Sequence, residues 1–313
     1  MEWQQFVMNL ETLNPASVEE ILIRHGAQSV TFSDAGDVPV LEPGPGETPL
    51  WSSTRISGLF EAGADMAGLL DDLMTSLELE ALPEHRLEAL ADRDWEREWL
   101  RDFGPMRFGE RLWVCPAGSE PDGQDAVVVR LDPGLAFGTG THATTAMCLE
   151  WLDSLDLEGR TLLEYGCGSG VLAIAALKLG CDRADAMDID AQAVLATRHN
   201  AADNGVQERL TVTSSAGDIA GQFDVVVANI LAGPLAELAA GVVSHVRPGG
   251  RLGLSGLLSE QAADVLEAYA PWVDFDEPDV RPQDGQTWTR LTGRKRHSQR
   301  CTPSVPNVAA HFA

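Results

Sequence analysis

The chain has 313 residues, enough for one large domain or two of ordinary size, and its 44% hydrophobic content excludes a largely disordered protein. It carries 48 acidic and 22 basic side chains, and residues 1–100 alone hold 20 acidic residues against five arginines. A surface of this sign repels nucleic acid and anionic membranes and attracts basic partners. Because the chain has only two lysines, the acidic excess is equally compatible with adaptation to a salty cytoplasm.

The five cysteines are scattered along the chain, without the close pairing of a metal site or a disulfide framework. The N-terminal segment lacks the basic start and apolar core of a signal peptide, and no apolar run is long enough to span a bilayer. We therefore expect a cytoplasmic protein with reduced thiols, no bound metal and no membrane partner.

Residues 1–90 are predicted to form a small α/β domain. A helix over 18–24 is followed by a strand over 29–32, and a second strand over 55–60 is followed by a helix over 65–77. Residues 39–49 contain four prolines and are predicted to be a loop. Two helices interleaved with short strands indicate a ferredoxin-like domain.

Residues 91–125 are predicted to be a connecting segment. Its first part is densely charged, and Trp95 and Trp99 are four residues apart, which places them on one face of a helix. This spacing predicts a helix whose tryptophans pack on a domain. Strands over 111–115 and 126–131, joined by a polar loop, are expected to form a pair.

Residues 126–296 alternate apolar strands and helices, the pattern of a parallel sheet that is covered on both faces. The predicted strands cover 161–165, 184–189, 210–213, 224–228 and 250–254, with a terminal pair near 273–275 and 287–291. The predicted helices cover 171–179, 191–204, 234–246 and 259–269. This pattern predicts a Rossmann-like seven-stranded sheet. Residues 297–313 are polar and are expected to be a disordered tail.

A glycine-rich turn, Gly166-Cys167-Gly168-Ser169-Gly170, links an apolar strand to a helix. Alternate glycines leave room for a ligand against bare backbone at the N-terminus of the helix. A dinucleotide-binding turn would require glycine at position 171, where this chain has Val171, so a nicotinamide oxidoreductase is disfavoured. The spacing resembles the first motif of class I S-adenosylmethionine (SAM) methyltransferases, and this resemblance implies that the seven-stranded sheet is the one of that class. A turn that serves only packing remains an alternative.

Polar residues also stand at the ends of two predicted strands. Asp188 comes about twenty residues after the glycine turn, where a carboxylate can accept hydrogen bonds from a ribose. Asp190 is instead expected to cap the next helix. Asn229 ends the fourth strand and should lie beside the reacting centre, unless it is a simple turn residue.

The segment 132–145 precedes the glycine turn and combines glycines, hydroxyl side chains and the start of a helix. It is predicted to close over the methionine end of SAM. His142 in this segment is a candidate general base, but a lone histidine beside a turn is more often structural.

The chain resembles PrmA, a family of bacterial ribosomal protein methyltransferases, in three stretches: 131–142, 166–170 and 229–235. The similarity extends over residues 1–296. Position by position, the resemblance and the glycine turn assign the SAM contacts to Thr145, Gly166, Gly168, Asp188 and Asn229. The chain departs from the family at Glu164, where an aspartate is frequent, and in its tail.

The resemblance implies repeated N-methylation of lysine side chains and of the N-terminal α-amine of the eleventh protein of the large ribosomal subunit. The acidic N-terminal domain would then recognise this basic protein, with no direct contact to nucleic acid. Desolvation of the amine makes a dedicated base unnecessary, so no catalytic residue is assigned. The alternatives are a non-catalytic SAM-binding factor associated with the ribosome, or a methyltransferase of the same fold that acts on another protein or on RNA.

Overall fold

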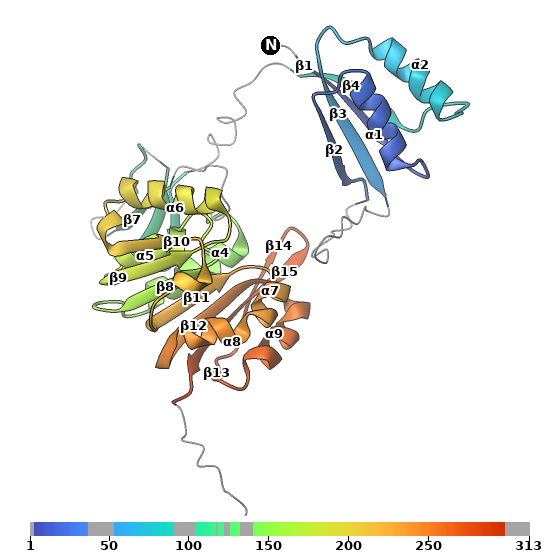
Figure 1. Ribbon diagram of the computed structural model, residues 1–313. Helices are drawn as coiled ribbons and strands as arrows, with labels where there is room; N and C mark the ends of the chain where they lie inside the picture. The colour runs from blue at the N-terminus through green and yellow to red at the C-terminus, as the bar shows by residue number, and fades with distance from the viewer. Residues whose placement is uncertain are drawn as a thin grey trace, which may run out of the picture. The chain divides into compact units, whose positions relative to one another are not determined.

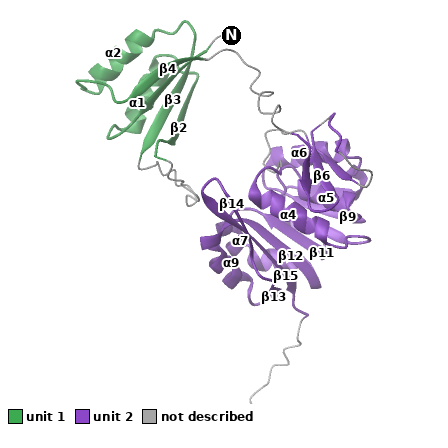
Figure 2. Ribbon diagram, turned by 180° about the vertical axis from the view of Figure 1, so that it is seen from behind, with its two compact units in different colours: residues 1–102 green, residues 103–313 purple. Residues whose placement is uncertain are grey.

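The computed structural model describes residues 3–36, 53–90, 104–116, 118–121, 126–131 and 140–297. The chain divides into two compact units, residues 1–102 and 103–313 (Figures 1 and 2). Within the described ranges, no helix is both long enough and apolar enough to cross a membrane.

The first unit has the element order β-α-β-β-α-β. Its first and last strands were not predicted from the sequence. Its elements are β1 (Trp3–Asn9), α1 (Pro15–Arg24), β2 (Ser29–Asp34), β3 (Thr54–Glu61), α2 (Met66–Ser76) and β4 (His85–Leu90). The strands form an antiparallel sheet in the order β2-β3-β1-β4, and both helices cover the same face (Figure 1). This is the ferredoxin-like arrangement that the sequence predicted.

Local sequence signals set the helices of the first unit. The side chain of Asn14 accepts a hydrogen bond from the amide of Ser17 before α1, and Asp65 caps α2 in the same way through the amide of Gly68. The apolar face of the sheet and the inner faces of both helices enclose a core of their own, which includes Phe6, Met8, Leu22, Ile56, Phe60, Leu69 and Leu73.

The second unit is built around an eight-stranded sheet in the order β10-β9-β8-β11-β12-β15-β13, with β14 paired to β15. The strands are β8 (Thr161–Tyr165), β9 (Arg183–Met187), β10 (Leu210–Thr213), β11 (Phe223–Asn229), β12 (Val246–Leu258), β13 (Val273–Phe275), β14 (Asp279–Gln283) and β15 (Gln286–Lys295). Strands β8 to β12 are parallel, whereas β15 runs antiparallel to its neighbours. The seven strands from β10 to β13 in this spatial order form the class I methyltransferase sheet predicted from the sequence, and β14 extends it.

Helices cover both faces of this sheet (Figure 1). The helices α4 (Ala143–Ser154), α5 (Val171–Lys178) and α6 (Ala191–Asp203) bury one face, and α7 (Ala232–Glu237), α8 (Ala239–Ser244) and α9 (Ala262–Tyr269) bury the other. The single helix predicted over 234–246 is wrong in this respect, because the chain breaks at Leu238 into α7 and α8. The first turn of the helix predicted over 259–269 is a 3-10 turn, Ser259–Gln261.

A separate three-stranded sheet also belongs to the second unit. It consists of β5 (Met106–Phe108), β6 (Leu112–Cys115) and β7 (Val127–Arg130), with β6 and β7 parallel. Strands β5 and β6 lie within the predicted connecting segment 91–125. The predicted helix that carries Trp95 and Trp99, the loop residues 132–139 and the tail from residue 298 lie outside the described residues.

Candidate active site

The glycine turn follows β8 and is held against the end of β9. The amides of Gly166 and Cys167 both donate to the carbonyl of Met187, at 2.8 and 3.0 Å. Gly166, Gly168 and Gly170 all have positive φ values of 78°, 52° and 75°, a conformation that side chains disfavour. A Cβ atom on Gly166 would lie 2.2 Å from Cγ2 of Ile230, so the turn leaves no space for a side chain there.

Asp188 follows β9 and closes the turn from the other side. Its Oδ2 accepts the amide of Gly168 at 2.8 Å, and its Oδ1 accepts the amide of Asp190 at 3.0 Å. Asp190 in turn accepts the amide of Gln192 at 2.9 Å, so it caps α6 as predicted. The two neighbouring carboxylates therefore have different surroundings: Asp188 lines the site, and Asp190 starts a helix.

Glu164, in β8, lies beneath the turn. It is 2% exposed, and its Oε2 accepts the amide of Ala173 in the first turn of α5 at 2.9 Å. Burial raises the pKa of this carboxyl to about 8, although hydrogen bonds from the amides of Ala173 and Leu172 favour the charged form. The longer reach of glutamate allows it to tie β8 directly to the helix after the turn.

Asn229 ends β11 and contacts the helix α4. Its Nδ2 donates to Oγ1 of Thr145 at 3.1 Å, and its Oδ1 is buried without a hydrogen-bond partner among the described residues. Thr145 itself is 1% exposed and does not line the cavity described below. The structure therefore places Thr145 beside the site, where it orients Asn229, while its neighbour Thr144 lines the cavity.

The N-terminus of α4 is fixed by side chains from distant segments. His142 is the N-cap, with its Nδ1 accepting from the amide of Thr144 and 2.8 Å from the Thr144 hydroxyl. The amide of Ala143 donates to Oε1 of Gln283 in β14. The pKa of His142 is lowered by burial, and the charge of Asp284 partly offsets this. The structural role of His142 is thus visible in its contacts.

The glycine turn, Asp188, Asn229 and the N-terminus of α4 border one cavity of about 520 Å³ at the carboxyl ends of β9, β8, β11 and β12. Its described lining is mostly apolar and comprises His142, Thr144, Tyr165, Gly166, Gly168, Met187, Asp188, Ile189, Asn229, Ile230, Leu231, Pro234, Leu238, Gly256 and Trp288. Ligands in open α/β sheets bind at this edge, so the position agrees with a cofactor site. Four of the five predicted cofactor contacts line it.

Sequence reasoning missed three kinds of lining residue. Trp288 reaches the cavity from β15, and nothing in its local sequence indicates a site. Gly256 has φ +92°, and a Cβ there would lie 2.3 Å from the carbonyl oxygen of Ile230. Leu238 enters the lining because α7 and α8 break at that residue. The first two depend on contacts between segments that are apart in the sequence, and the third depends on a helix break that the sequence pattern did not indicate.

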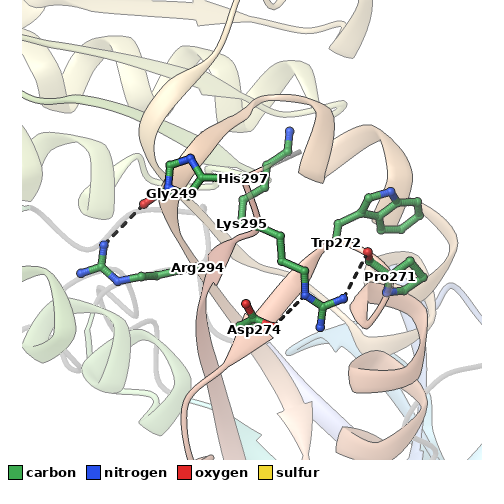
Figure 3. A pocket seen from close by; sticks show the side chains of 8 residues that line it. Gly249, Pro271, Trp272, Asp274, Arg294, Lys295 and His297 are labelled. Carbon is green, nitrogen blue, oxygen red and sulfur yellow. Dashed lines mark hydrogen bonds and ion pairs between the residues drawn. The ribbon is translucent and has the colours of Figure 1, made fainter. Parts of the chain in front are cut away.

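A second cavity, of about 800 Å³, lies near the opposite end of β15 (Figure 3). Its basic side chains already have partners: Lys295 donates to the carbonyls of Val243 and Val246, both at 2.8 Å, and Arg296 pairs with Asp274 at 2.7 Å. These cations cap the end of α8 and fasten the edge of the sheet, a structural role.

The family model for ribosomal protein L11 methyltransferase (PrmA) matches residues 2–296. The chain belongs to the PrmA family. It is 51% identical over 299 residues to ribosomal protein L11 methyltransferase from Actinobacillus pleuropneumoniae serotype 5b, covering 95% of this chain and all of that protein. It is 52% identical to the protein of the same name from Klebsiella pneumoniae strain 342, covering 94% of this chain and all of the relative.

Among solved structures, the ribosomal protein L11 methylase of Lactobacillus delbrueckii subsp. bulgaricus is 32% identical, with a TM-score of 0.56. The similarity covers 62% of this chain and all of that one. As a PrmA member with the class I methyltransferase sheet, the protein has S-adenosylmethionine as its cofactor. The cavity at the strand ends fits such a ligand, because Gly166 and Gly168 present bare backbone to it and the buried Oδ1 of Asn229, which has no partner among the described residues, is an acceptor at its edge.

Proposed function

We propose that this protein methylates amino groups of ribosomal protein L11, both lysine side chains and the N-terminal α-amine, up to the trimethylated state. The observation that carries the proposal is the buried Oδ1 of Asn229, which has no partner among the described residues at the edge of the cavity. A buried acceptor requires a donor. In the first two transfers the neutral amine is primary or secondary, so it can donate one N–H to this oxygen and still present its lone pair for attack.

The same geometry supports a proposal for the cofactor contacts. Asp188 would accept the ribose hydroxyls, because the two backbone amides it binds leave lone pairs on both carboxylate oxygens. The turn at Gly166 and Gly168 would lie against the cofactor, and Asn229 would face the transferred group with its amide oriented by Thr145. When bound, the cofactor supplies an electrophilic methyl group on a sulfonium.

The protein contributes alignment and a dry environment. Holding the nitrogen in line at near-attack distance supplies about 7–11 kcal/mol in well-oriented systems. A free lysine has a pKa of about 10.4 and an α-amine one of about 7.7–8.0, and burial lowers both because it disfavours the charged form. The apolar lining of the cavity provides this burial. A dedicated general base is therefore not required.

The first unit is proposed to recognise the substrate. Residues 1–100 hold 20 acidic and five basic side chains, and a negative surface attracts a basic ribosomal protein. It repels RNA, so a direct contact with nucleic acid is not part of the proposal. The enzyme would act in the cytoplasm, where its substrate is made.

The test is to incubate the purified protein and methyl-labelled SAM with total ribosomal proteins from a strain that lacks the enzyme. We expect label on L11, identified by gel and mass spectrometry as trimethylated amines. Label in RNA or in another protein would keep the fold and overturn the substrate. Tight SAM binding without transfer would favour a non-catalytic ribosome-associated factor.

A further inference from the structure

Trp288 and Asp188 lie at opposite ends of the cavity. Asp188 follows β9, and Trp288 lies in β15, with β8, β11 and β12 between these strands. Four strand spacings of about 4.8 Å place the backbones of β9 and β15 about 19 Å apart across the sheet. If Asp188 binds the ribose, the cofactor occupies the β9–β8 side and the target amine approaches from the side of Trp288.

Trp288 is held firmly in this position. Its indole packs edge-on against the ring of His142, with centroids 4.5 Å apart and planes at 75°. Its backbone pairs with Leu258 on one side and Arg281 on the other. Arg281 makes two hydrogen bonds to the carboxylate of Glu150 in α4, at 3.1 and 2.6 Å. The β14–β15 hairpin is thus anchored to the helix that carries Thr144 and Thr145.

The electrostatics at this end favour an aromatic cation site. Of the described lining residues, Asp188 alone carries a carboxylate, and it lies at the other end. His142 accepts from the amide of Thr144 through Nδ1, so that nitrogen carries no proton and the ring does not repel a cation. An aromatic face attracts ammonium groups, and methylated ammonium is the form that aromatic cages recognise.

We propose that Trp288, supported by His142, forms an aromatic wall that holds the partly methylated ammonium group of the substrate between successive transfers. The inference rests on the function proposed above. In each transfer the amine lone pair forms an N–C bond, the methyl–sulfur bond breaks with its electron pair staying on sulfur, and the first two products lose a proton to water. The wall retains the weakly hydrated product cation, so Trp288 sets how many methyl groups each amine receives.

The test compares the wild type with W288L, W288F and the control W272L, using L11 from a strain that lacks the enzyme. Trp272 is 38% exposed and borders the distant second cavity, so its loss should change nothing. We expect W288L to lower the rate of the third transfer relative to the first by about tenfold, the loss of a partly desolvated cation–π contact. W288F should retain most trimethylation. Mass spectra over time report the methylation states.

The outcomes separate the two proposals. A wild-type protein that does not methylate L11 overturns the proposed function and this inference with it. Active W288L with the wild-type distribution of products overturns the inference alone. A second measurement needs no variant: tetramethylammonium chloride should inhibit the wild type more than an equal concentration of sodium chloride, competitively with L11. Equal inhibition by the two salts would contradict the aromatic cation site even if the variants fail to fold.

Discussion

The amide group of Asn229 donates to the hydroxyl of Thr145 across 3.1 Å, which joins the end of β11 to the first turn of α4. This bond decides which end of the amide faces the site. Replacing Thr145 with valine keeps the volume and removes the acceptor, leaving a buried donor unsatisfied at a cost of about 1–3 kcal/mol. We expect T145V to lower kcat for L11 methylation by about tenfold, as measured with labelled SAM.

Serine provides the matched control at this position. T145S restores the hydroxyl, so it should recover most of the activity while T145V does not. Thr145 does not line the cavity, and therefore neither variant should change SAM affinity by more than about twofold. Wild-type kcat in T145V would show that the orientation of Asn229 does not depend on this contact.

Removing the carboxylate of Asp188 should weaken SAM binding. The side chain accepts two backbone amides at the turn and is proposed to accept the ribose hydroxyls as well. Hydrogen bonds to a charged group contribute about 1.5–3 kcal/mol, so D188A should raise the Kd for SAM by about 10- to 150-fold in calorimetry. An unchanged Kd would remove Asp188 from the cofactor site.

Asp190 gives an internal control two residues away. Its carboxylate accepts the amide of Gln192 and caps α6. Loss of a cap destabilises a protein by about 0.5–2 kcal/mol, so D190A should lower the denaturation midpoint while leaving the SAM Kd within about twofold. A large loss of affinity in D190A would mean that the two carboxylates act together.

The sequence predicted those parts of the site that depend on short-range order. Gly166, Gly168 and Asp188 follow from a strand, a turn and a helix that are adjacent in the chain, and these elements form where expected. Trp288 was not predictable, because it reaches the cavity through β15, which pairs with β12 and β14 far from the glycine turn. Strand β4 was missed for a related reason: its charged sequence becomes a strand by pairing with β1 across about 80 residues.

The buried carboxyl of Glu164 should make stability depend on pH. Burial raises its pKa from 4.5 to about 8 in the folded protein. Between these values the folded state keeps a proton that the unfolded chain releases, so this group lowers the free energy of unfolding as the pH rises. E164Q removes this titration, and its denaturation midpoint should fall less than that of the wild type between about pH 5 and about pH 8. Parallel profiles for the two proteins would show that Glu164 titrates normally.

Removing the first unit should separate cofactor binding from substrate recognition. Residues 103–313 form a compact unit with a hydrophobic core on each face of its sheet. This unit contains every described residue that lines the cavity. The first unit has its own core and most of the excess negative charge. A fragment of residues 103–313 should therefore bind SAM within about twofold of the full chain, because no contact to the cofactor is lost, and should not methylate L11. Calorimetry and labelled SAM measure the two properties, and retained methylation of L11 by the fragment would assign substrate recognition to the second unit.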